Sequence, residues 1–199
     1  MTDRMSDEDV LDALEQAGAV LAGHFVLTSG RHSDRYVQCS RVLEDTALTT
    51  RLAQEIAARV SERIGKSRFD LVAAPAVGGI ILGFAVAQAL GVNFIFSERE
   101  QGVMTFRRSF CVPPGARVLV VEDVVTTGGS VAEVVDLVET AGGRVPLVVS
   151  LIDRGGPKAF DVELLPLLKL EVESWNAQEC GLCASGEGLT SPGSRRISS

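Results

Sequence analysis

The most informative segment of the chain is Val118-Leu119-Val120-Val121-Glu122-Asp123-Val124-Val125-Thr126-Thr127-Gly128-Gly129-Ser130. Its first four residues are apolar and branched, which predicts a buried parallel strand. Two carboxylates follow, and a turn of Thr, Gly and Ser then leads directly into a helix. Glycines let a ligand approach the backbone closely, and the free amides at a helix start favour an anion. The stretch therefore predicts a phosphate cradle with acidic groups beside it.

The two carboxylates refine the expected ligand. Side chains alternate across a strand, so Glu122 and Asp123 can reach one ligand only if the strand ends there. We therefore expect the strand to end at these two residues. Carboxylates accept hydrogen bonds from ribose hydroxyls and are suitable neighbours for Mg²⁺. We therefore expect a ribose phosphate. The alternative is an ordinary strand, turn and helix whose acids face solvent.

The elements after this stretch bring a further cation to the same place. Ser130 and Glu133 fit a capping box, which predicts the helix start, and valines on one helical face predict packing against the core. The apolar run 145–152 predicts another strand, which delivers Arg154 to the carboxyl edge of the sheet, where open α/β folds bind ligands. The alternative is a surface arginine paired with Asp153.

A second loop of similar design precedes the first. Residues 71–74 predict a short strand, 75–79 a turn, and 80–90 an apolar helix that ends at Gly91. Near the N-terminus, the segments 6–18 and 46–64 predict amphipathic helices. Between them, two strand-like pieces flank Ser29-Gly30-Arg31 and predict a hairpin. The sequence as a whole predicts an α/β fold, a mainly parallel sheet flanked by helices with a small N-terminal hairpin or hood.

Length and composition set limits on organisation and function. The chain has 199 residues and a net charge of −7, which predicts one domain over 1–184 and a mobile tail over 185–199, rich in Gly and Ser. The negative charge argues against nucleic acid as a partner. No apolar run is long enough for a membrane span, and the N-terminal residues do not resemble a signal peptide. We therefore expect a cytoplasmic protein that does not bind membranes.

The stretch 118–130 resembles the phosphoribosyl-pyrophosphate motif of the type I phosphoribosyltransferases: a hydrophobic strand, two acids, two hydrophobic residues and Thr-Thr-Gly-Gly-Ser. The N-terminal hairpin is similar to that of the orotate phosphoribosyltransferase family, with Leu27-Thr28-Ser29-Gly30 and Ser33. This family often has a lysine where Thr28 stands and two aromatic residues where Tyr36 and Val37 stand. The resemblance implies transfer of phosphoribosyl from phosphoribosyl pyrophosphate to N1 of orotate, which gives orotidine 5′-monophosphate for pyrimidine (UMP) biosynthesis.

The resemblance also implies roles for individual residues. Asp123, Glu122 and Arg99 would be catalytic, and orotate would contact Thr126, Arg154, Thr28 and Tyr36. Mg²⁺ would be the cofactor, held mainly through the substrate, with Asp123 as the candidate protein ligand. Phosphoribosyl pyrophosphate would bind to two loops and one arginine: Glu122, Asp123, Val124, Val125, Thr126, Thr127, Gly128, Gly129, Ser130, Val77, Gly78, Gly79 and Arg99.

The segment 96–108 departs from the family pattern, because it is short and contains neither lysine nor histidine. By position, Arg99 matches the lysine that in the family reaches into the neighbouring subunit's site. Arg107 and Arg108 are the other candidates for this role. The resemblance thus implies a homodimer with shared active sites. The alternative for these arginines is the solvated face of a hairpin.

Two other functions remain open at the level of sequence. A purine phosphoribosyltransferase would share the main motif, but its pocket would take a neutral base. A non-catalytic regulator that senses the same ligand would keep the phosphate cradle and lose the cations that face the leaving group.

Cys180 and Cys183 form a CxxC pair, which suggests metal or redox chemistry. A zinc site needs four ligands, and the chain has no second CxxC; the remaining cysteines, Cys39 and Cys111, are distant in sequence. We therefore interpret the pair as two reduced cysteines in a terminal turn. Similar CxxC tails occur in bacterial members of the orotate family.

Overall fold

The sheet is built around the apolar strand that contains Val118 to Val121. In the computed structural model, which describes residues 4–27, 29–65 and 68–192, β6 (Arg117–Val125) lies between β3 (Leu71–Pro75) and β7 (Arg144–Asp153). All three strands are parallel. The sheet has the order β5-β4-β3-β6-β7-β8 and extends through three further strands, β4 (Asn93–Glu100), β5 (Val103–Phe106) and β8 (Leu164–Lys169). β5 is the antiparallel member, so the prediction of a mainly parallel sheet is confirmed.

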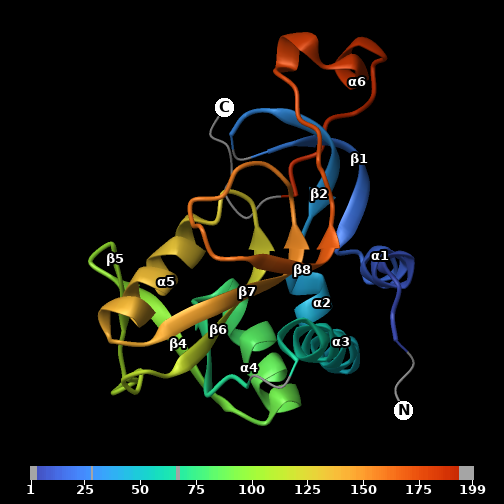
Figure 1. Ribbon diagram of the computed structural model, residues 1–199. Helices are drawn as coiled ribbons and strands as arrows, with labels where there is room; N and C mark the ends of the chain where they lie inside the picture. Colours follow the sequence, from blue (N-terminus) through green and yellow to red (C-terminus); the bar gives the residue numbers. More distant parts are fainter. Residues whose placement is uncertain (1–3, 28, 66–67, 193–199) are drawn as a thin grey trace.

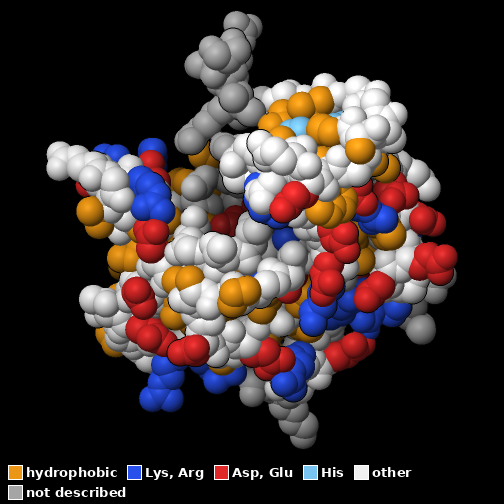
Figure 2. All heavy atoms as spheres, turned by 90° about the horizontal axis from the view of Figure 1, so that it is seen from above, with side chains coloured by type: hydrophobic (Ala, Val, Ile, Leu, Met, Phe, Trp, Pro, Cys, Tyr) orange, Lys and Arg blue, Asp and Glu red, His pale blue; other side chains and the backbone are white. Residues whose placement is uncertain are grey.

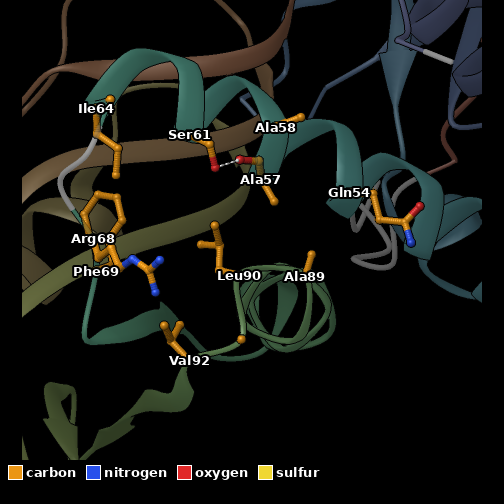
Figure 3. Close-up of a pocket in the computed structure, with 12 residues that line it drawn as sticks. Gln54, Ala57, Ala58, Ser61, Ile64, Arg68, Phe69, Ala89, Leu90 and Val92 are labelled. Carbon is orange, nitrogen blue, oxygen red and sulfur yellow. Dashed lines mark hydrogen bonds between the residues drawn. The ribbon is translucent and has the colours of Figure 1, made fainter. Parts of the chain in front are cut away.

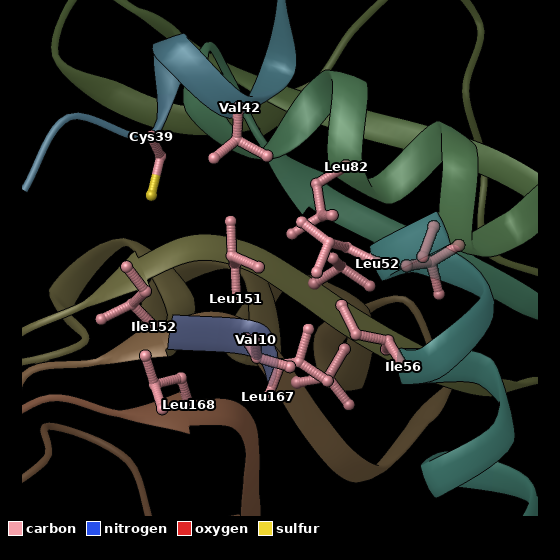
Figure 4. Packing of buried hydrophobic residues seen from close by; sticks show 14 of the residues in the cluster. Val10, Cys39, Val42, Leu52, Ile56, Leu82, Leu151, Ile152, Leu167 and Leu168 are labelled. Carbon is pink, nitrogen blue, oxygen red and sulfur yellow. The ribbon is translucent and has the colours of Figure 1, made fainter. Parts of the chain in front are cut away.

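Helices cover both faces of this sheet (Figure 1). One face carries α1 (Asp7–Gln16), α2 (Ser40–Leu43), α3 (Thr46–Ile64) and α4 (Gly78–Leu90), and the other carries α5 (Gly129–Thr140). β6 contributes to the hydrophobic cores on both faces of the sheet. Leu119 belongs to the first core, on the side of α3 and α4, and Val120 belongs to the second core, on the side of α5. This double burial explains why its sequence is continuously apolar. Figure 4 shows the first core, where Val10, Leu52 and Leu151 meet from a helix, a helix and a strand.

Most predicted helices and strands are confirmed within two residues. α3 has the predicted bounds, and Ser6 caps α1 through its side chain in a capping box with Asp9. α4 begins at Gly78, two residues before the expected start, and ends where Gly91 adopts a left-handed conformation with φ 70°. Only glycine takes up that conformation at little cost.

The predicted hairpin is present as a separate two-stranded sheet, β1 (Val20–Val26) with β2 (His32–Val37). The C-terminal segment lies against it from two sides, since Trp175 bridges to His32 and Thr190 bridges to Phe25. This segment includes a 3₁₀ turn, η1 (Ala177–Glu179), and the short helix α6 (Gly181–Ala184) at the top of Figure 1. We call β1, β2 and residues 173–190 the hood.

The boundary predicted at residue 185 stays a prediction, and residues 193–199 lie outside the described part of the chain. Within the described part, the amide of Thr190 donates to the carbonyl of His24 at 2.8 Å, so residues beyond 185 make ordered contacts with the hood. None of the helices in the described residues combines the length and apolar composition needed to cross a bilayer.

Candidate active site

A pocket opens where β6 ends and α5 begins, at the carboxyl edge of the parallel sheet. Its volume is about 310 Å³. The turn 126–128 and the first turn of α5 form one side, and Arg99 and Glu133 stand at the rim. Most of the predicted cradle and two further residues of α5, Val131 and Glu133, line the pocket, whereas Asp123 and Val125 are not part of its lining. The lining residues are Arg99, Glu122, Val124, Thr126, Thr127, Gly128, Gly129, Ser130, Val131 and Glu133. The first amides of α5 have no partner within the helix, so the pocket is suited to a phosphate.

The turn depends on Gly128 for two reasons. Its φ of 74° lies in the left-handed region, and a Cβ at this position would come within 2.3 Å of the Phe160 ring. Gly128, rather than Ser130, precedes the first helical residue of α5, so the predicted capping box of Ser130 and Glu133 is wrong. The helix begins one residue before Ser130, and the Glu133 carboxylate instead accepts a hydrogen bond from Arg99 at 2.7 Å. The amides that a capping side chain would have occupied thus stay available to a ligand.

Glu122 and Asp123 lie beside each other near the start of α4. The expectation that the strand ends before them is wrong, because β6 continues to Val125 in register with β7. The ladder with β3 ends at Val120, however, so the acids follow the last residue of β6 that pairs with β3. A Cβ on Gly78 would lie 2.7 Å from an Asp123 carboxylate oxygen, and one on Gly79 would lie 3.2 Å from a Glu122 oxygen. Both carboxylates can therefore serve one ligand without the strand ending.

Crowding of these acids affects their ionisation. Burial, reinforced by the neighbouring negative charge of Asp123, raises the pKa of Glu122 to about 9. Burial and the same two carboxylates raise the pKa of the Cys39 thiol. Two carboxylates at one site repel each other, so a cation or hydroxyl donors would relieve an unfavourable arrangement.

The second loop brings another helix start to the acids. α4 is capped by Val77, whose side chain is 82% exposed, and it begins with Gly78 and Gly79. The close approach of Asp123 explains the glycine at 78, since any side chain there would displace the carboxylate. The structure thus brings Val77, Gly78 and Gly79 next to Glu122 and Asp123, as the sequence predicted for a single ligand site.

Arg154 follows β7 and faces the hood. Its backbone amide donates to the carbonyl of Val125 at 2.9 Å, which fixes it beside the end of β6. The guanidinium is half-buried, and its Nε has no hydrogen-bond partner among the described residues. Burial lowers the pKa of Arg154, and the nearby Tyr36 has a smaller opposite effect. Arg154 and Tyr36 therefore converge as predicted, whereas Thr28 lies outside the described residues.

The arginines of the β4–β5 hairpin have partners within their own chain. Arg99 donates to the carbonyl of Gly102 at 2.9 Å as well as to Glu133. Arg107 lies 3.5 Å from Glu100, and Arg108 lies 3.3 Å from Glu98. Among the three, Arg99 lines the phosphate pocket.

Lys158 is a functional candidate that the sequence analysis missed. Its ammonium group lies 2.7 Å from the Asp153 carboxylate and donates to the carbonyl of Thr126 at 3.0 Å. It thereby fastens the loop after β7 to the phosphate turn. No spacing rule predicts such a contact, because Lys158 and Thr126 are 32 residues apart. Phe160, which covers Gly128, was missed for the same reason.

A larger cavity of about 890 Å³ lies at the opposite edge of the sheet, where α3 and α4 end (Figure 3). Apolar side chains such as Ile64, Phe69 and Leu90 line it, together with Arg68. The described residues of its lining include no carboxylate. We therefore assign the chemistry to the smaller pocket.

Comparisons with known proteins show which family the chain resembles. A family model described as a phosphoribosyl transferase domain matches residues 42–181. The orotate phosphoribosyltransferase of Heliobacterium modesticaldum is 50% identical over 96% of this chain and 100% of its own length. That of Thermotoga maritima is 45% identical over 94% of this chain and 99% of its own length. The crystal structure of orotate phosphoribosyltransferase from Aeropyrum pernix aligns with a TM-score of 0.69 and 29% identity, over 81% of this chain and 94% of that one.

Proposed function

The chain belongs to the orotate phosphoribosyltransferase family, and from this premise we propose that it transfers phosphoribosyl from phosphoribosyl pyrophosphate to N1 of orotate. The products are orotidine 5′-monophosphate and pyrophosphate. The observation that carries the proposal is the convergence of the phosphate turn, the acid pair and the start of α4 at one edge of the sheet. The two alternatives are not favoured, because the relatives that match nearly the full length are named for orotate.

The proposed arrangement follows from where the chain offers donors and acceptors. The 5′-phosphate binds at the turn 126–130 against the first amides of α5, and the pyrophosphate lies at the start of α4, at residues 77–79. Glu122 and Asp123 then accept hydrogen bonds from the ribose hydroxyls between the two anionic groups. Because the acids hold the ribose and the helix starts hold both phosphate groups, the anomeric carbon is oriented toward the base.

Charge separation during the transfer explains why both signs are needed. When N1 attacks the anomeric carbon and the bond to pyrophosphate breaks, positive charge develops on the ribose ring and negative charge on the leaving group. The Asp123 carboxylate stabilises the former, with the carboxyl oxygens of Glu122 beside it, and Arg99 with the amides of α4 stabilises the latter. The protein needs no covalent intermediate, since positioning and electrostatics suffice.

The donor set beside Gly78 fits Mg²⁺. This ion prefers oxygen ligands and is commonly bound through one or two carboxylates together with substrate phosphates. Asp123 would hold it, with Glu122 next to it, and the crowding that raises the pKa of Glu122 supports a cation at this position. When bound, the ion supplies charge neutralisation of the pyrophosphate.

The base is recognised by the hood side of the site. We propose that Arg154 holds the orotate carboxylate or imide edge, because its guanidinium is half-buried and its Nε lacks a partner among the described residues. Tyr36 lies next to it, and Thr126 lies on the phosphate side. Thr28 completes the proposed set. The enzyme is proposed to act in the cytoplasm as a homodimer, where Arg99 of one subunit serves the neighbouring site.

A turnover assay with orotate, uracil and adenine as acceptors tests the proposal. With phosphoribosyl pyrophosphate and Mg²⁺, orotate should be consumed and the other bases should not. Asp123→Asn should lower turnover at least tenfold, which corresponds to about 1.4 kcal/mol in the barrier. Asp136→Asn, an exposed change on α5, is the matched control. Preference for adenine would overturn the choice of base, and full activity of Asp123→Asn would overturn the role of the acid pair.

A further inference from the structure

Four potential metal ligands meet in the hood, away from the phosphate pocket. They are His24, His32, Cys180 and Cys183, and their ligand atoms all lie within 4.8 Å of one another. Three of the four side chains are buried, and Cys183 is exposed. In Figure 2, which looks down on the molecule from above, histidine atoms are visible among hydrophobic side chains. The active-site proposal uses none of these four residues.

The distances within this cluster match a tetrahedral site. His24 Nε2 lies 3.0 Å from His32 Nδ1, 3.4 Å from Cys180 Sγ and 3.7 Å from Cys183 Sγ. Cys183 Sγ lies 3.2 Å from His32 Nδ1. Zinc bonds of about 2.05 Å to nitrogen and about 2.3 Å to sulfur would place tetrahedral ligands about 3.3–3.8 Å apart. Two of the four observed separations, 3.4 and 3.7 Å, fall in this range, and the two to His32 Nδ1, 3.0 and 3.2 Å, lie just below it, so small shifts of the side chains would place all four groups around one ion.

Hydrogen bonds alone do not account for the convergence. His24 Nδ1 lies 2.9 Å from the carbonyl oxygen of Glu187, which can only accept, so Nδ1 carries the proton. A neutral His24 then has a single lone pair, at Nε2, although His32 and both cysteines surround that atom. A metal ion at the centre accepts a lone pair from each of them. The contact to Glu187 is also the orienting hydrogen bond that metal-binding histidines usually make.

The backbone is shaped to aim the ligands inward. The register between β1 and β2 shifts between Ala22 and Phe25, and His24 lies in this irregular stretch. Such bulges redirect a side chain, which here brings His24 to the same side as His32. On the other side, Cys180 precedes α6 and Cys183 lies within it. The CxxC spacing thus supplies two ligands from one tight turn, as in structural zinc sites.

We propose that His24, His32, Cys180 and Cys183 bind a structural Zn²⁺ ion that fastens the C-terminal segment onto the N-terminal hairpin. Zinc suits two imidazoles and two thiolates in a closed tetrahedral site. Binding directs four lone pairs to the ion and releases the two thiol protons to solvent, with no change of oxidation state. The site is independent of the proposed function, since its ligands lie outside the phosphate pocket. It replaces the interpretation of Cys180 and Cys183 as merely two reduced cysteines in a terminal turn.

The hydrogen bonds around the cluster indicate what the ion stabilises. Trp175 and His32 exchange two backbone hydrogen bonds at 2.8 Å, and Thr190 pairs with His24 and Val26 at 2.8 and 3.0 Å. His32 takes part in the first of these bridges and His24 in the second, and Cys180 and Cys183 lie between Trp175 and Thr190 in the sequence. Zinc would therefore fix both connections at once and hold residues 180–190 on the hairpin.

Metal content of the full chain tests the proposal. Purified protein is freed of metal, titrated with Zn²⁺ against a competing chelator, and analysed by mass spectrometry for bound zinc. Wild type and Cys111→Ser, a matched exposed cysteine elsewhere, should bind one ion per chain. Cys183→Ser should bind at least tenfold more weakly, and because Cys183 is exposed, the change leaves the buried core intact. Co²⁺ should give the intense visible absorption of a tetrahedral thiolate site in the first two proteins alone.

Hydrogen exchange supplies a second readout. Removing zinc should speed exchange of the Thr190 and Val26 amides at least tenfold, while amides of β6 stay protected. If wild type binds no zinc, binds it as Cys183→Ser does, or forms a Cys180–Cys183 disulfide in place of the metal site, the proposal is overturned. Unchanged exchange at Thr190 after metal removal would overturn the fastening role.

Discussion

At the scale of single residues, the acid pair lowers the stability of the folded protein and serves the chemistry of the site. Glu122 is 8% exposed and lies next to a second carboxylate, so it takes up a proton more readily than an ordinary glutamate. Arg154 is in the opposite situation, since burial disfavours its charge and its Nε has no partner among the described residues. A bound ligand can therefore supply a cation or hydrogen-bond donors to Glu122 and a hydrogen-bond acceptor to the Nε of Arg154.

The raised pKa of Glu122 predicts a pH dependence of stability. Between the ordinary carboxyl range and about pH 9, the folded protein keeps a proton that the unfolded chain has released. The free energy of unfolding should therefore fall as pH rises through this window, measured by urea unfolding without substrate. Glu122→Gln should flatten the decline, and Glu139→Gln, an exposed control on α5, should not. Parallel profiles for wild type and Glu122→Gln would contradict the assignment.

Arg154 should determine the affinity for the base. A guanidinium can hold a carboxylate with two parallel hydrogen bonds, which an alanine cannot replace and a lysine replaces poorly. We expect Arg154→Ala to raise the KM for orotate far more than the KM for phosphoribosyl pyrophosphate, measured by initial rates. Arg154→Lys is the control that keeps the charge. Equal increases of both KM values would show that Arg154 is structural.

At the scale of elements, the local sequence predicts those helix and strand bounds that hydrophobic periodicity and turn residues determine. The bounds of α3 and the end of α4 at Gly91 followed from such patterns. β8 was not predicted; it contains Pro166, which lacks a backbone N–H, and it lies at the edge of the sheet, where proline is tolerated. Lys158 and the histidine–cysteine cluster depend on contacts between distant segments, which no local pattern contains.

The start of α5 should report directly on phosphate binding. A Cβ added at Gly129 meets no described atom within 4 Å, yet Gly129 lines the pocket. Gly129→Ala should therefore leave stability unchanged or raise it by up to about 1 kcal/mol, since alanine is the better helix former. Its methyl group should weaken binding of phosphoribosyl pyrophosphate at least tenfold, measured by calorimetry. Gly188→Ala, also in open space, is the control. Unweakened binding would place the phosphate elsewhere.

At the scale of the whole molecule, a site can be complete within one chain or can be shared between two subunits. Arg99 contacts Glu133 of its own chain at 2.7 Å and lines its own phosphate pocket. The resemblance to the family nevertheless implies that Arg99 acts in the neighbouring subunit of a dimer. The two arrangements make opposite predictions for mixed dimers.

Mixing inactive Asp123→Asn chains with inactive Arg99→Ala chains should restore activity if sites are shared. Half of the dimers would be hybrids, each with one intact site, so activity should reach about a quarter of wild type. Turnover is measured after native mass spectrometry has confirmed subunit exchange, and each variant mixed with itself is the control. Absence of recovery would assign Arg99 to its own chain's site, where its contact with Glu133 already places it.

The hydrogen bonds that join the N-terminal hairpin to the C-terminal segment also have a consequence for folding during translation. Ser33 and Arg31 bond to residues 140 and 143 positions later, and His24 to one 163 positions later. During translation at roughly 5–20 residues per second, the nascent hairpin would wait on the order of ten seconds for these partners to leave the ribosome. The α/β core can begin to assemble in that interval. The base-binding side of the enzyme is therefore finished last, so a ribosome that stalls before residue 170 would display a chain whose N-terminal hairpin lacks the C-terminal part of the hood.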